Sequence, residues 1–141
     1  MQPQDTYFED VQEGDDGPGW KLENLTRTHF VKYAGASGDF NPMHHDDTIA
    51  AQVGNPSVFG HGMLTAGLMA RVVKDWFGPE AMRTFSVRFA KQVWPGDTIT
   101  FTAVVTAKRE EAGERLVDLE CVATNQDGVE VLTGTAIAAC P

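Results

Sequence analysis

The sequence is poor in positive charge, and this shortage argues against two classes of partner. Its 141 residues include 11 lysines and arginines but 20 aspartates and glutamates, giving a formal net charge of −9 at pH 7. There is no basic run and no cysteine spacing typical of a zinc module, so we expect no nucleic-acid partner. The same acidity disfavours anionic lipid, and we expect no membrane partner. A small anionic ligand is still compatible, because a few local cations can bind a phosphate.

Cysteine and long apolar runs are equally scarce. Cys121 and Cys140 lie far apart among apolar or small residues, and we predict that both are buried free thiols. No apolar run reaches the length of a membrane span, and residues 1–10 lack the apolar segment of a signal peptide. With 42% hydrophobic and 22% charged residues, the chain is expected to be a soluble cytoplasmic protein. Its length suits a single domain spanning residues 1–141.

One long apolar segment occupies the middle of the chain. Residues 63–77 are mostly apolar, and Arg71, Lys74 and Asp75 form only a narrow polar stripe. A helix that is apolar almost all round must be enclosed by other parts of the protein. We therefore predict a central helix over residues 62–77, ended by the glycine and proline at positions 78 and 79.

Two shorter helices are expected before the central one. Thr26 has the features of an N-cap, and the apolar residues that follow have helical spacing until glycine and serine accumulate at 35–38. A second helix is expected to begin at Asp47 or Thr48 and to end before residues 54–56, where a glycine and a proline occur.

The second half of the chain has the pattern of strands. Phe85, Val87 and Phe89 alternate with smaller or polar residues, and the tetrapeptide NQDG at 125–128 predicts a hairpin. We expect strands over residues 20–25, 83–93, 98–108, 116–124 and 129–139, with a short one near Tyr7, Phe8 and Val11. Several strands and one very apolar helix predict an α+β fold in which a sheet curls around that helix.

A polar stretch at residues 36–46 interrupts the apolar pattern. Asp39 and His44 are five positions apart with Pro42 between them, and a loop rather than a helix would let both side chains enter one cleft. A carboxylate and an imidazole that face one cavity can hold and deprotonate water, or remove a proton from carbon. The alternative is a capped loop, in which Asp39 or Asp46 caps the next helix and the histidines lie on the surface.

The same stretch raises the question of a metal site. His44, His45 and Asp46 include three ligand types, but adjacent histidines on a loop point apart and no third ligand has a familiar spacing. We therefore predict no metal and no other cofactor. We expect His45 to face solvent or to support its neighbours.

A second polar position occurs at the start of the central helix, in the sequence FGHGML at residues 59–64. Backbone N–H groups at a helix N-terminus are unpaired, and the helix dipole favours negative charge there. Because Gly62 has no side chain, a carbonyl oxygen could approach its N–H closely, as in an oxyanion hole. The alternative is an ordinary helix start, with His61 as a capping or packing residue.

These two stretches together resemble the signature of MaoC-like, (R)-specific enoyl-CoA hydratases and dehydratases. The similar residues are YAGASGDFNPMH at 33–44, HGML at 61–64 and RFAKQVWPGD at 88–97. The resemblance covers about residues 26–100 and implies a hot-dog fold, an antiparallel sheet wrapped around a long central helix. It also implies that Asp39 and His44 add one water to a trans-2-enoyl thioester, giving a (3R)-3-hydroxyacyl thioester, or catalyse the reverse dehydration.

The resemblance implies further roles and leaves some open. Gly62 would stabilise the thioester oxygen, Asn41 would brace the dyad, and His61 is grouped with the substrate-binding residues. A serine that some members carry in the central helix is absent from residues 67–70, whereas small residues at 66, 67 and 70 leave room for an acyl chain. The division of acid and base between the dyad members stays open.

The expected substrate is a thioester of CoA or of acyl carrier protein. Arg83, Arg88 and Lys91 are candidates to bind the phosphates of CoA. The family resemblance implies pairing of sheet edges into a homodimer, with a heterodimer containing a second hot-dog subunit as the alternative. Two other functions stay open, an acyl-binding subunit without its own catalysis and a hot-dog thioesterase.

Overall fold

A curved antiparallel sheet forms the body of the protein. The computed structural model describes residues 6–141, so the first five residues of the predicted 1–141 domain lie outside the described range. The five strands have the spatial order β1-β3-β4-β5-β2, and every neighbouring pair is antiparallel. Their bounds are β1 Trp20–Leu22, β2 Met82–Phe89, β3 Ile99–Glu111, β4 Glu114–Thr124 and β5 Glu130–Cys140.

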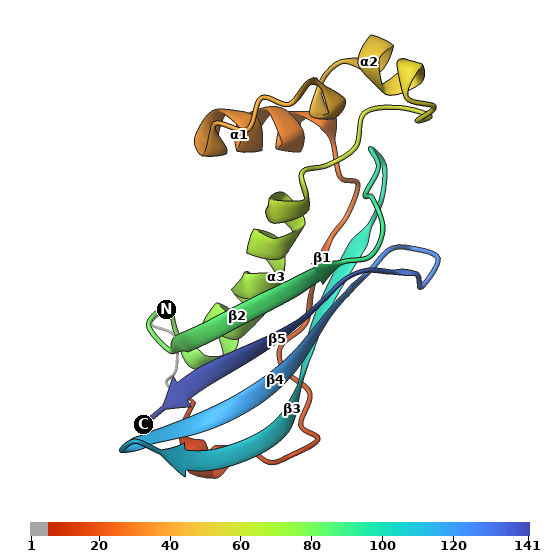
Figure 1. The fold of residues 1–141 in the computed structure, drawn as a ribbon. Coiled ribbons are helices and arrows are strands. Elements are labelled where there is room, and N and C mark those ends of the chain that lie inside the picture. Colours follow the sequence, from red (N-terminus) through yellow and green to blue (C-terminus); the bar gives the residue numbers. More distant parts are fainter. Residues whose placement is uncertain (1–5) are drawn as a thin grey trace.

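The long helix α3, Gly62–Phe77, lies against one face of this sheet (Figure 1). Its bounds are those predicted from the apolar segment, and it ends where Gly78 adopts a positive φ of 96°. Met69 and Val72 are completely buried against the inward-facing residues of the strands, such as Phe101 and Leu119. Burial of this helix against the curved sheet forms the hydrophobic core, as the α+β interpretation of the sequence predicted.

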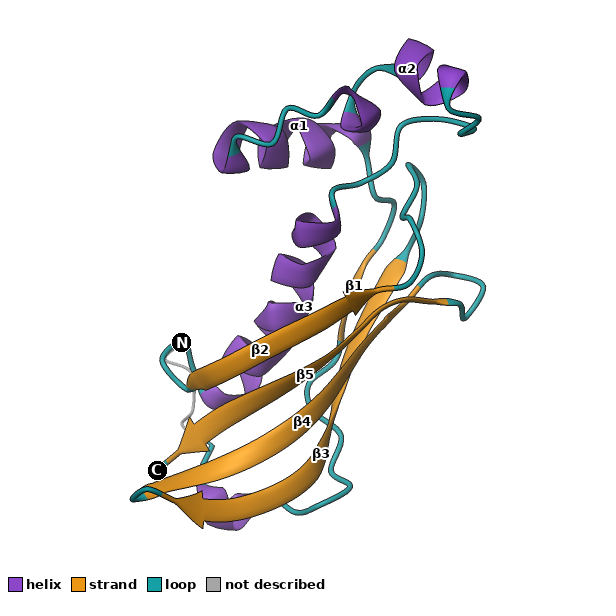
Figure 2. Ribbon diagram, viewed as in Figure 1, coloured by secondary structure: helices purple, strands orange, loops and turns teal. Residues whose placement is uncertain are grey.

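Two smaller helices and a 3-10 turn gather at the end of the molecule where α3 begins (Figures 1 and 2). They are α1 Arg27–Ser37, the 3-10 turn η2 Pro42–His44 and α2 Asp47–Gln52. Thr26 caps α1 as predicted, in a reciprocal pair with His29. The C-terminus lies at the opposite end of the sheet (Figure 1).

The prediction of a short strand near Tyr7, Phe8 and Val11 is wrong. Residues Phe8–Asp10 instead form a 3-10 turn, η1. The physical reason is the side chain of Lys108, whose ammonium group donates hydrogen bonds to the carbonyls of both Phe8 and Val11. Two carbonyls that converge on one cation require the backbone to turn, which an extended strand cannot do.

The two edges of the sheet differ. On one side the short strand β1 pairs with β3, and residues 14–17 cover the next part of β3 through hydrogen bonds to Ala103 and Val105. On the other side β2 pairs with β5 alone. Within residues 6–141, β2 is therefore the one long strand with an unpaired edge.

The remaining predictions about the chain as a whole have different outcomes. Cys121 and Cys140 are buried free thiols, as predicted, and burial raises the pKa of the Cys121 thiol to about 11. None of the helices in the described part of the chain combines the length and apolar character needed to cross a membrane. The cytoplasmic location stays a prediction.

Gly134 offers a test of the packing between β2 and β5. A Cβ at this position would lie 2.7 Å from the carbonyl oxygen of Ser86 in the paired strand. Relieving this clash would require the backbone of β2 to move, which costs more than rotating a side chain. We expect Gly134→Ala to lower the free energy of unfolding by about 1–3 kcal/mol. The matched control is Gly67→Ala in α3, where a Cβ has no atom within 4 Å, and we expect a gain of about 0.5–1 kcal/mol. Urea titration followed by circular dichroism measures both, and equal stability of the two variants would contradict the packing argument.

Candidate active site

The candidate site begins with a loop that its own short polar side chains hold in shape. Gly38 ends α1 with a positive φ of 76°, which turns the chain out of the helix. The Asp39 N–H then donates to Ser37 Oγ at 3.1 Å, and Asp39 Oδ1 accepts from the Asn41 N–H at 3.2 Å. Asn41 Oδ1 in turn accepts from the Met43 N–H and caps the turn η2. Asn41 therefore braces the segment between the two dyad residues.

His44 is buried, with 8% of its surface exposed, whereas the surface alternative required an exposed side chain. Its Nδ1 lies 2.7 Å from the carbonyl oxygen of Phe59, which can only accept, so Nδ1 carries the hydrogen. The ring of Phe59 also packs edge-on against the imidazole. In the neutral ring, Nε2 is therefore left as a lone-pair acceptor.

The loop brings Asp39 and His44 together. Asp39 Oδ2 lies 3.9 Å from His44 Nε2, and the carboxylate side chain is 51% exposed whereas that of His44 is 9% exposed. A separation of 3.9 Å is too long for a direct hydrogen bond. Asp39 Oδ2 and His44 Nε2 are therefore two unbonded acceptors that face the same solvent-accessible position.

His61 packs against the His44 member of this pair. Its ring stacks on that of His44 with centroids 3.9 Å apart and an interplanar angle of 29°. Its Nε2 lies 3.0 Å from the backbone carbonyl oxygen of Asp39, and only 1% of its surface is exposed. His61 precedes the first residue of α3 without a capping bond from its side chain.

The helix start at Gly62 has the features expected of an oxyanion site. Within residues 6–141 the Gly62 N–H has no hydrogen-bond acceptor, as is usual for the first residue of a helix. The ring of Phe89 lies against Gly62, close enough that a Cβ would meet it at 2.8 Å. The absence of a side chain at this position is therefore what gives space to both the ring and a ligand atom.

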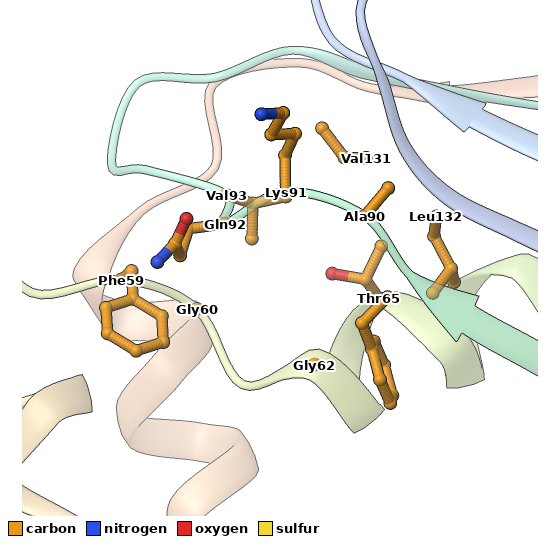
Figure 3. Close-up of a pocket in the computed structure, with 11 residues that line it drawn as sticks. Phe59, Gly60, Gly62, Thr65, Ala90, Lys91, Gln92, Val93, Val131 and Leu132 are labelled. Atoms are coloured by element: carbon orange, nitrogen blue, oxygen red, sulfur yellow. The ribbon is translucent and has the colours of Figure 1, made fainter.

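A cavity of about 360 Å³ opens beside Gly62, between residues 59–62 and the end of β2 (Figure 3). Most of its lining is apolar, and Thr65 and Gln92 contribute uncharged polar groups. Figure 3 shows the Thr65 hydroxyl directed into the cavity, where it makes no hydrogen bond with any residue of the described chain. The cavity is lined by Phe59, Gly60, Gly62, Thr65, Phe89, Ala90, Lys91, Gln92, Val93, Val131 and Leu132.

Several residues that the sequence analysis considered lie outside this arrangement. His45 is exposed, with Nε2 3.2 Å from the carbonyl oxygen of Phe40, and Asp46 caps α2. Arg83 is paired with Glu114 at the start of β2, whereas the cavity lies at the other end of that strand, so Arg83 cannot serve the cavity. Arg88 and Lys91 make no ion pair among the described residues.

Thr65 is the pocket residue that the sequence analysis missed. Residues 67–70, where the family resemblance implied a serine in some members, carry no polar side chain. The available signal was a hydroxyl on an otherwise apolar helix, one turn after Gly62. The small residues expected to leave room, at 66, 67 and 70, do not line the cavity.

Asp39, His44 and His61 are also the one group among residues 6–141 whose ligand atoms could approach a metal ion together, lying within 4.8 Å of one another. Their orientation is a poor match for coordination. The stacked rings place the lone pairs of the two histidines in nearly parallel planes, and His61 Nε2 is engaged with a carbonyl oxygen. A metal bound through His61 Nε2 would have to break that bond, and the absence of a metal stays a prediction.

Burial lowers the pKa of His61 from its ordinary value of 6.5, and the positive charge of a protonated His44 acts in the same direction. The unfolded chain therefore binds a proton at this position at a higher pH than the folded chain does. Stability from this group is present above about pH 6.5 and is lost as pH falls toward the lowered pKa, by at most about 1.4 kcal/mol per pH unit.

We expect the unfolding free energies of wild type and His61→Gln to follow different pH dependences below pH 6.5. The wild type should lose stability faster on acidification, because glutamine cannot be protonated. Denaturant titrations at pH 5.5 and 7.5 give the difference, and parallel changes in the two proteins would contradict a buried neutral His61.

Comparisons with known proteins give the family of the chain. Residues 17–126 match the family described as MaoC like domain, which is more than half of the chain. The chain belongs to this family. The family predicted from residues 33–44, 61–64 and 88–97 is thereby confirmed.

Relatives of similar length carry hydratase names. The chain is 32% identical over 105 residues to the 3-oxo-4,17-pregnadiene-20-carboxyl-CoA hydratase beta subunit of Mycobacterium tuberculosis, covering 74% of this chain and 78% of that protein. It is 34% identical over 102 residues to the (R)-specific enoyl-CoA hydratase of Rhodospirillum rubrum, covering 71% and 69%. By contrast, it spans 9% of the length of the Saccharomyces cerevisiae peroxisomal hydratase-dehydrogenase-epimerase, at 42% identity over 61% of this chain.

Solved structures confirm the hot-dog fold. The (R)-hydratase from A. caviae involved in PHA biosynthesis superposes with a TM-score of 0.84 at 26% identity, over 94% of this chain and 99% of that one. A chain of the ChsH1-ChsH2 complex from Mycobacterium tuberculosis superposes with a TM-score of 0.81 at 29% identity, over 93% and 99%. The second structure is a heteromeric complex, which bears on the question of partners.

Proposed function

We propose that this MaoC-like protein catalyses the (R)-specific hydration of trans-2-enoyl thioesters, or the reverse dehydration of (3R)-3-hydroxyacyl thioesters. The observation that carries the proposal is the pair of acceptor atoms, Asp39 Oδ2 and His44 Nε2, 3.9 Å apart. The hydratase and dehydratase names of the family relatives support it.

The dyad geometry suits one water molecule. A carboxylate oxygen and an unprotonated ring nitrogen are both acceptors, so one water between them donates a hydrogen to each. Both hydrogens of the water are then engaged, and a lone pair on its oxygen is free to attack the β carbon of the substrate. Because His44 Nδ1 donates to Phe59, the ring is held in the tautomer that leaves Nε2 available.

The electrons and protons of the reaction are then accounted for. The water oxygen forms a bond to the β carbon while one of its O–H bonds breaks, and a dyad member takes that proton. The π electrons of the double bond shift toward the thioester carbonyl, whose oxygen accepts a hydrogen bond from the Gly62 N–H. The proton that the dyad took from the water is then delivered to the α carbon, which completes the addition and restores the dyad. The cavity beside Gly62 is the proposed site for the acyl group.

The proposal is tested by incubating the purified chain with crotonyl-CoA and longer enoyl-CoAs. Hydration removes the absorbance of the conjugated enoyl thioester without releasing free thiol, and chiral chromatography of the product should give the (3R) alcohol. Release of thiol with the enoyl group intact would instead identify a thioesterase. Absence of both reactions in a folded, pure protein would contradict the proposal for the chain alone.

A second candidate function is favoured by a specific observation. One relative is named as a beta subunit, and one structural neighbour is a heteromeric complex. In this alternative, the chain binds the acyl thioester as one subunit of a hydratase and needs a second hot-dog subunit for activity. Gain of hydration on adding a hot-dog chain from the same genome, with none before, would support it.

We propose a homodimer formed through β2. Among the described strands it alone has a long unpaired edge, and apolar side chains more than half exposed occur at its end and at the nearby helix start, on Phe89 and Met63. Sedimentation velocity of the purified chain should give twice the monomer mass of 15.4 kDa, and a monomer at micromolar concentration would favour the heteromeric alternative.

We propose CoA rather than acyl carrier protein as the carrier. Lys91 lines the cavity and is free of ion pairs within residues 6–141, so its ammonium group is available to a phosphate. The chain as a whole is acidic, which opposes docking of an acidic carrier protein. Comparison of kcat/KM for the same enoyl group on the two carriers tests this choice.

A further inference from the structure

His61 is an unusual residue to find in the core of the candidate site. It is polar and 1% exposed, and its side chain does not line the cavity, so direct contact with a substrate is not its role there. Edge-on packing against Tyr33 and stacking on His44 hold the ring between α1 and the dyad. Its ring nitrogens can therefore interact only with other groups of the protein and not with a substrate in the cavity.

The hydrogen bond from His61 to Asp39 defines the state of the ring. A backbone carbonyl oxygen can only accept, so the hydrogen lies on Nε2, 3.0 Å from Asp39 O. The other nitrogen, Nδ1, is buried and has no partner among residues 6–141. Protonation would place a second N–H where no acceptor exists, so the neutral Nε2–H form is the one that fits the site.

This bond joins two parts of the site that are far apart in sequence. All the other polar contacts of Asp39 among the described residues are with residues 37–44, in its own loop. His61 is 22 positions further along the chain and immediately precedes Gly62, whose N–H faces the thioester oxygen in the proposed reaction. The bond thus links the carboxylate that holds water to the helix start that holds the substrate.

We propose that His61 is a positioning residue, whose Nε2–H fixes the backbone of Asp39 relative to Gly62 and so sets the distance from the dyad to the β carbon. This inference rests on the proposed hydratase function. It predicts that removal of the N–H slows the chemical step and leaves substrate binding nearly unchanged, because the cavity lining is not altered.

Three substitutions of His61 distinguish the effect of losing the Nε2–H donor from the effect of losing the aromatic ring. His61→Phe keeps an aromatic ring in the stack but has no donor. His61→Gln places an amide N–H near the position of Nε2, whereas His61→Asn places it near that of Nδ1. A misplacement of about 1 Å can cost roughly 100-fold in rate. We expect His61→Phe and His61→Asn to lower kcat by roughly 10- to 100-fold with KM within about threefold, and His61→Gln to stay within about fivefold of wild type.

Thermal unfolding by circular dichroism confirms that each variant is folded before its kinetics are compared. His61→Phe with wild-type kcat would overturn the inference, and so would His61→Gln as slow as a folded His61→Phe. Rescue by glutamine alone would support it, because a merely structural defect would not depend on where the amide lies.

A second measurement needs no activity and no variant. Nitrogen-15 NMR of histidine side chains in the wild type should show His61 as the neutral Nε2–H tautomer between pH 6 and 8. The titratable groups that face it are Asp39, His44 and His45, with the Tyr33 ring packed from α1. A hydrogen on Nδ1 would overturn the inference whether or not the protein is a hydratase. An inactive wild type with the expected tautomer would instead contradict the proposed function alone.

Discussion

Asp39→Asn is expected to lower kcat for enoyl-CoA hydration by about 10²- to 10⁴-fold, the usual contribution of a general acid or base. The substitution replaces a charged acceptor with an amide whose oxygen can still accept the hydrogen bond from the Asn41 N–H, so the loop should keep its shape. The change therefore removes the negative charge and the proton-accepting capacity while the local structure is retained.

His44→Asn is the matched change at the other member of the dyad. The amide of asparagine lies near the position of Nδ1 and can still donate to the carbonyl of Phe59, whereas Nε2 and its lone pair are lost. His44→Ala removes both and leaves a space in a buried site. We expect a loss of about 10²- to 10⁴-fold for each, measured as kcat at saturating crotonyl-CoA with unchanged circular dichroism.

His45→Ala is the control for both dyad substitutions. His45 is the exposed neighbour of His44, and its ring lies against the carbonyl oxygen of Phe40 rather than taking part in the Asp39–His44 pair, so its removal should change kcat by less than about twofold. Because Asp39 and His44 act on one water, the double variant Asp39→Asn/His44→Asn should be little slower than either single variant. Additive losses, or a single variant with wild-type turnover, would contradict the proposed dyad.

The parts of the fold that local chemistry determines were predicted well. The bounds of α3, the Thr26 cap and the presence of four strands after residue 81 follow from apolar spacing, capping residues and turn residues. The strand predicted over residues 83–93 is shorter, because β2 ends at Phe89. Asp39 and His44 were identified as a pair because Pro42 and the glycine at 38 indicate a loop between them. These features depend on neighbours within a few positions, and the sequence contains those neighbours.

The parts that depend on distant contacts could not be predicted. The turn at Phe8–Asp10 is caused by Lys108, about a hundred positions away. Arg83 is unavailable to a ligand because Glu114 lies beside it on the next hairpin. From the sequence, His61 looks like an ordinary residue at a helix start. Its hydrogen bond to the carbonyl of Asp39 forms only when the loop at Asp39 packs against it. In each case the decisive partner is adjacent only after the chain has folded.

Gly62→Pro is expected to lower kcat by about 10²- to 10³-fold, the usual cost of losing one oxyanion donor. Proline has no N–H, so the substitution deletes the group assigned to the thioester oxygen. The backbone should accept it, because proline is favoured at the first position of a helix. The preceding residue, His61, has φ −58° and ψ 133°, which is the conformation that a following proline requires.

Gly62→Ala supplies the matched control for that deletion. It adds a Cβ that meets the ring of Phe89 at 2.8 Å, as proline also does, but it keeps the N–H. The atoms that the added Cβ meets are at the far end of the Phe89 side chain, which can shift, and we expect the alanine variant to lose at most about tenfold in kcat. The ratio of the two variants, both checked for folding by thermal unfolding, then isolates the hydrogen bond from the steric change. Equal losses would mean that crowding by Phe89 accounts for the effect, and the role of the Gly62 N–H would have to be abandoned.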